Sequence, residues 1–376
     1  MPRQSRSEIE HSFQRHRASP RVSLEEYVRQ RRIELGRALD GKTRIYLDTR
    51  FWIILRDVGL GSRTDEDSRA LLAELRRIVG TGKGFCPTSE VVTAELLKQS
   101  DLSTRRHTAR LIDELSTGVS FAPEEERIGT ELAHLLQLLR DPDSVYRRDW
   151  LVWLRPIYAA VMRHPANTGF APEVELALQK VVFDDMWEMT VEEFVEQLGD
   201  AAPPPLQTSF EALAERLNHG NEAHGAQVRS YQQAYAAEVF GAVGVFAGRG
   251  VDILSRMYAR DTGETKSLSV QERAANERAL HNILANALRL GKLHEELPSL
   301  HVVATCHAIY RWDKKRRFEA NDFWDFHHAV AALGYCDVFL TESDLRAILR
   351  ARKLDEELGC SIICDIGEAV RHLKGV

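Results

Sequence analysis

Acidic side chains stand beside the segments of this chain that have the composition of buried strands. Asp48 ends the apolar run 44–48, and Glu342 directly follows a second run at 338–341. Clustered carboxylates repel one another and raise each other's pKa unless a cation neutralises them. Their hard oxygen atoms suit Mg²⁺ or Mn²⁺ better than zinc. These positions predict a site for a divalent ion that activates water and neutralises charge on a scissile phosphate.

Three further carboxylates join this set through the predicted helices. Glu95 lies two turns into the helix that follows a short strand at 85–87, and Asp322 and Asp325 lie in the first turn of a helix that begins near residue 322. In a parallel sheet, the carboxyl end of each strand and the amino end of the following helix lie on the same side. The set expected at that edge of the sheet is Asp48, Glu95, Asp322, Asp325 and Glu342.

Several of these acidic positions also have a structural interpretation. Asp322 has the position of a helix cap, and Glu95 could be an exposed helix residue. Asp337 precedes its strand, about 13 Å from the carboxyl edge, so we assign it a structural role in a neighbouring turn. Ser343 occupies a place where another carboxylate would be expected, and Asp344 is either a ligand or the cap of its own helix.

A basic block lies a few residues before Asp322 and could bind the phosphates that flank a cleavage site. A solvated loop that balances local charge explains the same residues equally well. The block consists of Lys314, Lys315, Arg316 and Arg317. Trp312 and Trp324 flank it, and either could stack on an unpaired base, although Trp324 also fits a core position.

Two adjacent histidines follow the acidic helix start. Neighbouring helix residues do not face one another, so His327 and His328 cannot act together on one ligand. One of them could touch a phosphate. For His328 the core interpretation is favoured.

The composition of the 376 residues is that of an ordinary globular protein, with 44% hydrophobic and 28% charged residues. No run approaches the ~20 apolar residues of a membrane span, and the polar residues 1–8 lack the apolar core of a signal peptide, so a cytoplasmic location is expected. The net charge of −6 gives no overall sign of nucleic-acid binding, yet it permits a basic groove around an acidic site. Five irregularly spaced cysteines predict buried free thiols.

The pattern of the chain predicts an α/β fold, with a parallel sheet flanked by helices and interrupted by a large all-helical insertion. A basic helical arm occupies 1–42, and the two halves of the α/β unit occupy 43–118 and 298–376. The insertion at 119–297 is rich in Ala, Leu, Glu and Arg, and no strand-like alternation interrupts it.

Three segments together resemble the PIN-domain family of ribonucleases. They are Leu47-Asp48-Thr49 after a strand, residues 89–97, and residues 325–341, where Asp325 begins an Asp-x-x-h-Ala-x-Ala-Ala pattern and Thr341 ends the next strand. The resemblance covers about 43–118 and 298–376. It implies a PIN-like fold with metal ligands at Asp48, Glu95 and Asp325. Ser343 departs from the family's fourth acidic position, which Glu342 or Asp344 could replace.

The motifs together predict a metal-dependent nuclease that cleaves RNA, or DNA, through a carboxylate-bound Mg²⁺ or Mn²⁺. The alternative is a catalytically weak PIN-like module that binds nucleic acid or a protein partner. A dehalogenase-type phosphoryl transferase is disfavoured because Arg50 stands where its second Asp is required, and no Walker-type phosphate loop is present. A membrane partner is not expected. The partners left open are a protein inhibitor and a second copy of the chain.

Overall fold

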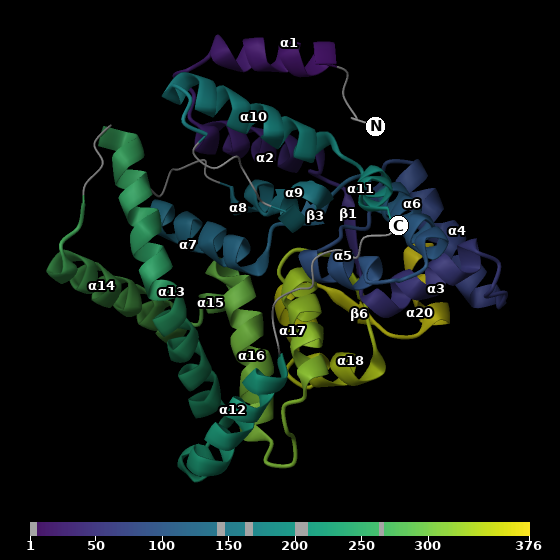
Figure 1. The fold of residues 1–376 in the computed structure, drawn as a ribbon. Helices are drawn as coiled ribbons and strands as arrows, with labels where there is room; N and C mark the ends of the chain where they lie inside the picture. Colours follow the sequence, from purple (N-terminus) through teal and green to yellow (C-terminus); the bar gives the residue numbers. More distant parts are fainter. Residues whose placement is uncertain (1–5, 141–146, 162–167, 200–209, 263–266) are drawn as a thin grey trace.

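The computed structural model describes residues 6–140, 147–161, 168–199, 210–262 and 267–376. Its centre is a four-stranded parallel sheet with the strand order β2-β1-β5-β6 (Figure 1). The strands are β1 (Thr43–Leu47), β2 (Gly84–Phe85), β5 (Val338–Leu340) and β6 (Ser361–Ile363). β1 pairs with β5 from Ile45↔Val338 to Leu47↔Leu340, so strands nearly 300 residues apart form the middle of the sheet. The predicted α/β class with a helix-flanked parallel sheet is confirmed.

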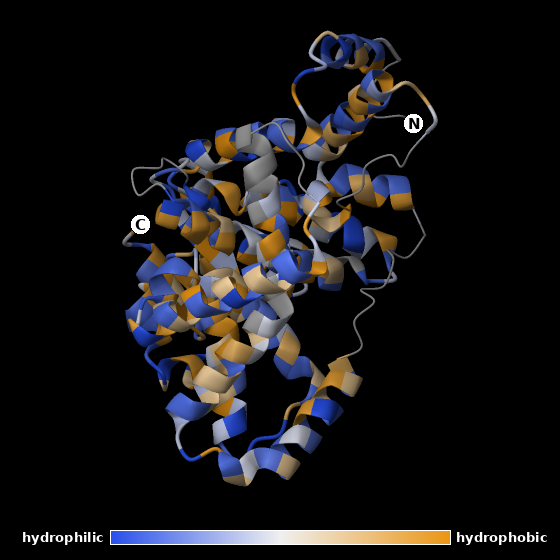
Figure 2. Ribbon diagram, turned by 90° about the vertical axis from the view of Figure 1, so that its left-hand side faces the viewer, coloured by the Kyte–Doolittle hydropathy of each residue, from blue (hydrophilic) through white to orange (hydrophobic). Residues whose placement is uncertain are grey.

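The strands are short and almost wholly apolar because both faces of the sheet are covered. Ile45, Tyr46 and Leu47 of β1 have no exposed surface, and neither has Phe339 of β5. The helices around them present polar residues outward and apolar residues inward, so hydrophilic and hydrophobic colours alternate along most helices in Figure 2. The apolar face of one such helix is buried and consists of Leu71, Leu72, Leu75 and Ile78.

In the described chain, the two α/β segments, 43–118 and 298–376, contain nine helices besides the four parallel strands. They are α3 (Thr49–Gly59), α4 (Glu66–Gly80), α5 (Glu90–Leu97), α6 (Leu102–Ser116), α16 (Pro298–Trp312), α17 (Ala320–Leu333), α18 (Ser343–Arg350), α19 (Leu354–Leu358) and α20 (Ile366–Leu373). At the amino end of the described chain, α1 (Arg6–Arg17) and α2 (Leu24–Ala38) lie within the segment 1–42. Ser23 caps α2, with its Oγ accepting from the Glu26 N–H at 3.1 Å.

The segment 119–297 is mostly helical, but the prediction that it contains no strand is wrong. β3 (Ser120–Phe121) and β4 (Trp153–Leu154) form a small antiparallel sheet. Each strand has only two residues, too few to show a period of two in the sequence. The pairing depends instead on tertiary packing, since the rings of Phe121 and Trp153 lie 4.6 Å apart.

The helices of this middle segment divide between two cores. They are α7 (Glu124–Arg140), α8 (Arg148–Leu151), α9 (Pro156–Val161), α10 (Pro172–Glu188), α11 (Val191–Leu198), α12 (Phe210–His224), the 3₁₀ turn η1 (Gly225–Gln227), α13 (Tyr231–Thr262), α14 (Val270–Arg289) and α15 (Leu293–Glu296). Phe183 and Trp187 of α10 belong to the core that contains the sheet. Leu132 of α7 and Leu280 of α14 belong to a second core. Figure 1 shows α13 and α14 on the side of the molecule away from α3, α4 and α20. Among the helices that the structure describes, none combines the length and apolar character needed to cross a lipid bilayer.

The start of α17 differs from the sequence prediction in a way that matters for the acidic residues. The helix begins at Ala320 rather than near residue 322, and Glu319 is its N-cap. Asp322 is therefore the third helical residue, and Asp325 lies in the second turn rather than the first. The sequence analysis missed this because Glu is an uncommon cap, whereas Asp322 has the residue type usually found there.

Candidate functional site

Asp48 lies at the junction of β1 and α3, at the carboxyl edge of the sheet. Its Oδ1 accepts a hydrogen bond from the Phe51 N–H at 3.1 Å, so the side chain caps α3. The residue is only 4% exposed. Burial raises the pKa of the Asp48 carboxyl, against the lowering effects of nearby His328 and of hydrogen bonds from Phe51 and Thr341. A charged Asp48 is therefore held where solvent cannot stabilise it.

Asp325 lies close enough to Asp48 for the charge of Asp48 to affect its pKa. Burial raises the pKa of Asp325 to about 7, and the charges of Glu342, Asp48 and Asp322 push it in the same direction. Of the charges that act most on Asp325, only that of His328 lowers its pKa. Three of the other four predicted carboxylates are thus close enough to Asp325 to raise its pKa.

Glu342 and Asp322 contribute to this set in different ways. Glu342 stands at the N-cap position of α18 without making a side-chain cap, and it is exposed. Asp322 has both oxygens engaged, because Oδ1 accepts from the Tyr310 hydroxyl at 2.6 Å and Oδ2 from the Glu319 N–H at 2.7 Å. Asp322 is thus the third-residue member of the capping box of α17, and the cap itself is Glu319 rather than Asp322.

Glu95 is held beside the same edge by two neighbours. Its Oε2 accepts a hydrogen bond from the Thr49 hydroxyl and lies 3.6 Å from His328 Nε2. Burial acts to raise the pKa of Glu95, but the hydrogen bonds of His328 and Thr49 outweigh it and lower the pKa. Glu95 is therefore a stabilised anion, unlike Asp48 and Asp325.

The predicted carboxylates share an edge without converging on one point. In the described ranges, no group of three or more His, Cys, Asp or Glu side chains is arranged so that it could hold a metal ion. The donor chemistry of the set fits a hard cation, since every member offers carboxylate oxygen. Side-chain rotation would be needed to bring three of them together.

The basic block lies in the loop between α16 and α17, and three of its four members contact neighbouring groups. Lys314 Nζ donates to the Gly225 carbonyl at 2.9 Å, and Arg317 pairs with Glu222 at 2.9 Å. Arg316 lies over the Tyr310 ring at 5.4 Å. All four residues, including Lys315, are exposed. The loop leads directly into the amino end of α17.

His328 is the functional candidate whose polar contacts the sequence analysis missed. It is buried, as the core interpretation predicts, yet both ring nitrogens face polar groups. Nδ1 lies 3.0 Å from the Tyr46 hydroxyl, and Nε2 lies 3.4 Å from Thr49 Oγ1 as well as near Glu95. The spacing of three residues from Asp325 was the available signal, since residues three apart lie on the same face of a helix.

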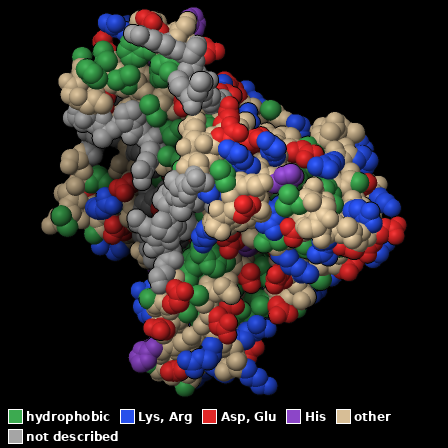
Figure 3. Space-filling view, turned by 45° about the vertical axis from the view of Figure 1, so that its right-hand side comes forward, with side chains coloured by type: hydrophobic (Ala, Val, Ile, Leu, Met, Phe, Trp, Pro, Cys, Tyr) green, Lys and Arg blue, Asp and Glu red, His purple; other side chains and the backbone are tan. Residues whose placement is uncertain are grey.

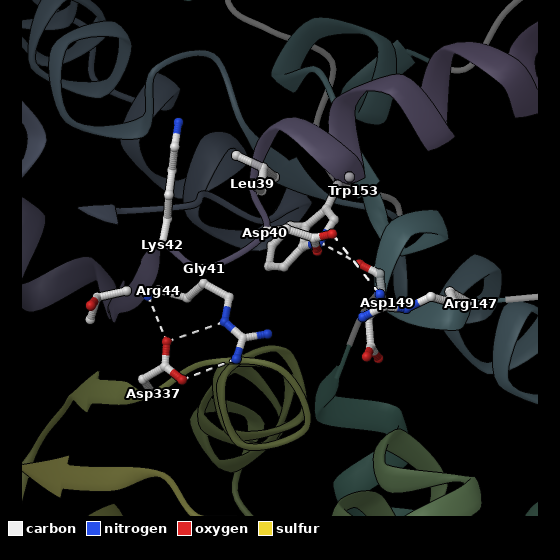
Figure 4. Close-up of a pocket in the computed structure, with 11 residues that line it drawn as sticks. Leu39, Asp40, Gly41, Lys42, Arg44, Arg147, Asp149, Trp153 and Asp337 are labelled. Atoms are coloured by element: carbon white, nitrogen blue, oxygen red, sulfur yellow. Dashed lines mark hydrogen bonds and ion pairs between the residues drawn. The ribbon is translucent and has the colours of Figure 1, made fainter. Parts of the chain in front are cut away.

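A cavity of about 390 Å³ lies at the opposite end of β1 (Figure 4). It is lined by Gly36, Leu39, Asp40, Gly41, Lys42, Thr43, Arg44, Arg147, Asp149, Trp153 and Asp337. Asp337 accepts from the Arg44 backbone N–H at 2.7 Å and pairs with its guanidinium at 3.0 Å, which fits the predicted structural role. None of the five predicted carboxylates lines this cavity. Arg44 and Asp48 are four residues apart on an extended strand, a separation of about 13 Å.

Comparisons with protein-family models, with curated proteins and with solved structures return no match for this chain. Inference about function therefore depends on the chemistry of the side chains at the carboxyl edge.

Proposed function

We propose that this protein is a metal-dependent nuclease that hydrolyses phosphodiesters, with RNA as its substrate. One observation carries the proposal: burial raises the pKa of Asp325 to about 7, and the charges of Glu342 and Asp48 act in the same direction. Keeping mutually repelling carboxylates half-buried costs folding free energy, and such arrangements concentrate at functional sites. A divalent cation would relieve this repulsion.

The residues that would hold the cation are Asp48, Asp325 and Glu342, with Glu95 as the fourth. Bound there, Mg²⁺ or Mn²⁺ would lower the pKa of a water molecule and neutralise charge on the phosphate. Glu342 is exposed and makes no cap, so its side chain is free to turn toward the other two. Asp322 would not bind the cation directly, because both of its oxygens already accept hydrogen bonds.

The resemblance of the sequence to PIN-domain ribonucleases supports the choice of nuclease chemistry and of RNA. An aspartate after the first strand and a threonine after β5 are shared with that family's pattern. Asp48 and Thr341 hold these places, and a hydrogen bond from Thr341 lowers the pKa of Asp48. On the face drawn in Figure 3, basic and acidic side chains intermingle and do not form one basic patch.

A second candidate is a PIN-like module that binds nucleic acid or a protein partner without cutting it. The side chain of Ser343 favours this candidate, because it cannot replace a carboxylate as a ligand of a hard cation. Among the described residues, no three of the carboxylates are arranged to hold a metal ion, which also favours the binding module.

Cleavage assays on the full chain separate the two candidates. We expect the purified protein to cut single-stranded RNA with Mn²⁺ or Mg²⁺ and to stop with EDTA. Asp48→Asn should lower the rate at least about 100-fold, beyond the range usual for residues that only support a metal ligand. Asn is as good a helix cap as Asp, so α3 should keep its start.

The matched control is Asp67→Asn, an exposed aspartate in the first turn of α4, which should cut like the wild type. RNA binding without metal-dependent cleavage would favour the binding module. Cleavage of a DNA strand of the same sequence, with the RNA left intact, would replace RNA as the substrate.

A further inference from the structure

The cavity at the amino end of β1 is formed by segments that lie far apart in the sequence (Figure 4). The turn between α2 and β1 contributes Lys42, the residue before α8 is Arg147, and Asp337 precedes β5. Gly36 lets α2 pass close to α8, because a Cβ at this position would lie 2.3 Å from the Cα of Trp150. Close packing of α2, α8 and the sheet therefore forms the walls.

One side of the cavity has an excess of positive charge, from Arg44 and Lys42. Asp337 is already occupied there, since it accepts from Nε and Nη2 of Arg44 at 3.2 and 3.0 Å and from the Arg44 backbone N–H at 2.7 Å. Burial acts to lower the pKa of Arg44, but the hydrogen bonds and charge of Asp337 outweigh it and raise the pKa. The guanidinium carries five N–H donors, so Nη1 remains available. No hydrogen bond or ion pair joins Lys42 Nζ to a described residue.

The other side of the cavity has an excess of negative charge. Its charged residues, Asp40, Arg147 and Asp149, lie at the top and right of Figure 4. Asp40 accepts from Trp150 Nε1 at 3.0 Å, and Arg147 Nη1 lies 4.0 Å from Asp40 Oδ2, too far for a hydrogen bond. Asp149 Oδ1 lies 3.6 Å from Arg148 Nε, which is also beyond hydrogen-bond distance. Carboxylate oxygens are therefore available on this side.

This separation of charge selects a molecule that carries both signs. Three cationic side chains and three carboxylates line the cavity, so a ligand without net charge keeps the balance. A phosphate monoester would place negative charge near Asp40 and Asp149, and a simple amine would leave the cationic side uncompensated. A carboxylate suits the paired N–H groups of a guanidinium, and an ammonium group suits carboxylate oxygens. The volume of about 390 Å³ is in the range of small-molecule sites.

We propose that this cavity binds a free amino acid, with its α-carboxylate held by Arg44 and Lys42 and its α-ammonium held by Asp40 and Asp149. A polar amino acid fits best, because Leu39 and Trp153 are the two large apolar side chains of the lining. The cavity is separate from the carboxyl edge of the sheet, so this inference does not depend on the proposed nuclease activity.

The test measures binding of each standard amino acid to the full chain by thermal unfolding and then by calorimetry. The tightest binder is compared with its two analogues that lack one charge. For L-glutamine these are glutaramate, without the ammonium group, and 4-aminobutanamide, without the carboxylate. Each analogue should bind at least about 10-fold more weakly, since it loses charge-assisted hydrogen bonds. Inorganic phosphate should not compete.

Two variants locate the bound amino acid. Arg44→Lys keeps the positive charge but removes the fork of N–H groups, and Asp149→Asn removes one carboxylate; each should weaken binding about 10-fold. The matched control is Arg76→Lys, which should bind normally. Arg76 pairs with both oxygens of Glu114, at 2.7 and 3.0 Å, outside the cavity. If Arg44→Lys does not fold, Asp149→Asn decides, because the exposed side chain of Asp149 makes no hydrogen bond to a described residue.

Three results would overturn the proposal. The first is that no standard amino acid binds. The second is an analogue with a single charge that binds as tightly as its parent amino acid, because the cavity would then recognise only one sign. The third is unchanged affinity in Asp149→Asn, which would place the amino acid elsewhere. None of these results bears on RNA cleavage, so the two proposals fail separately.

Discussion

The chain builds one arrangement of side chains twice, in regions with different surroundings. At the carboxyl edge of the sheet, His328 lies between the Tyr46 hydroxyl and Glu95, at 3.0 and 3.6 Å. Between α13, α16 and α19, His301 lies between the Tyr235 hydroxyl and Glu357, at 2.7 and 3.2 Å. The second set has the shorter contacts and joins the helical segment to the end of the α/β unit.

The neighbours of the two sets are what distinguish them. Glu357 has a second histidine beside it, His294 at 3.6 Å, and the pKa of Glu357 is lowered, first by its hydrogen bond with His301. Glu95 instead shares its histidine with Asp48 and Asp325, whose pKa values are raised. In the set of Tyr235, His301 and Glu357, the nearby His294 can compensate the charge of the carboxylate, so we interpret this set as structural. The set around His328 lies beside uncompensated carboxylates and is a candidate for cation chemistry.

The largest contrast should appear when one carboxylate is neutralised in each region. Asp325→Asn should lower metal-dependent cleavage at least about 100-fold, whereas Glu357→Gln should leave cleavage unchanged. Thermal unfolding without metal should rank the two variants the other way, with Asp325→Asn gaining stability and Glu357→Gln losing it. Asp325→Asn removes a repelled charge and should gain on the order of 1 kcal/mol at pH 8, while Glu357→Gln should lose stability. A loss of both stability and activity in Asp325→Asn would contradict this division.

Added Mn²⁺ should stabilise the protein through the acidic edge and not through the region around His301. At a Mn²⁺ concentration about 100 times its Kd, the free energy of unfolding should rise by about 2.7 kcal/mol, because the ion binds only the folded state. Calorimetric scans with and without Mn²⁺ measure this rise. Asp48→Asn should abolish it, and His301→Leu should retain it in full. An equal rise in Asp48→Asn would place the bound ion elsewhere.

The pH dependence of stability should have opposite signs in the two regions. Asp325 has a folded pKa of about 7 against an ordinary value of 3.8, so its contribution falls as the pH rises between these values. Glu357 has a lowered pKa, so its contribution is present above its ordinary value of 4.5 and is lost as the pH falls. Urea unfolding in EDTA, compared between the wild type and each single variant, isolates the two slopes. Slopes of the same sign would remove the electrostatic basis of the comparison.

The smallest expected effect concerns Asp322, whose side chain accepts from the Glu319 N–H in the capping box at the start of α17. Asp322→Ala removes the hydrogen bond to the Glu319 N–H and should cost about 1 kcal/mol of stability, of the order found when a capping hydrogen bond is lost. Its effect on cleavage should be much smaller than that of Asp325→Asn. Urea unfolding and initial cleavage rates measure the two quantities. A fall in rate as large as that of Asp325→Asn would make Asp322 a direct ligand.

The sequence predicted those parts of the fold that depend on local pattern. The continuous apolar run before Asp48 and the run before Glu342 identified two central strands, because a strand covered on both faces has no polar alternation. The position of a carboxylate at the end of a strand then followed from topology alone. Asp48, Asp325 and Glu342 do lie close enough to affect one another's protonation.

The features that the sequence did not predict depend on contacts between distant residues. Trp153 and Phe121 form strands only because they meet each other, and two-residue strands leave no periodic signal. The start of α17 depends on a reciprocal pair of hydrogen bonds between Glu319 and Asp322. The polar surroundings of His328 depend on Tyr46, which lies 282 residues away in the chain. Sequence spacing could not reveal that partner.

The pairing of β1 with β5 also has a consequence for biosynthesis. A growing polypeptide presents Asp48 first, and Asp325, β5 and Glu342 leave the ribosome only after the nearly 300 residues that separate β1 from β5. Until then β1 lacks its central partner, and the two halves of the acidic edge cannot meet. The acidic edge that we propose as a nuclease site would thus stay incomplete while the segment between its two halves is translated.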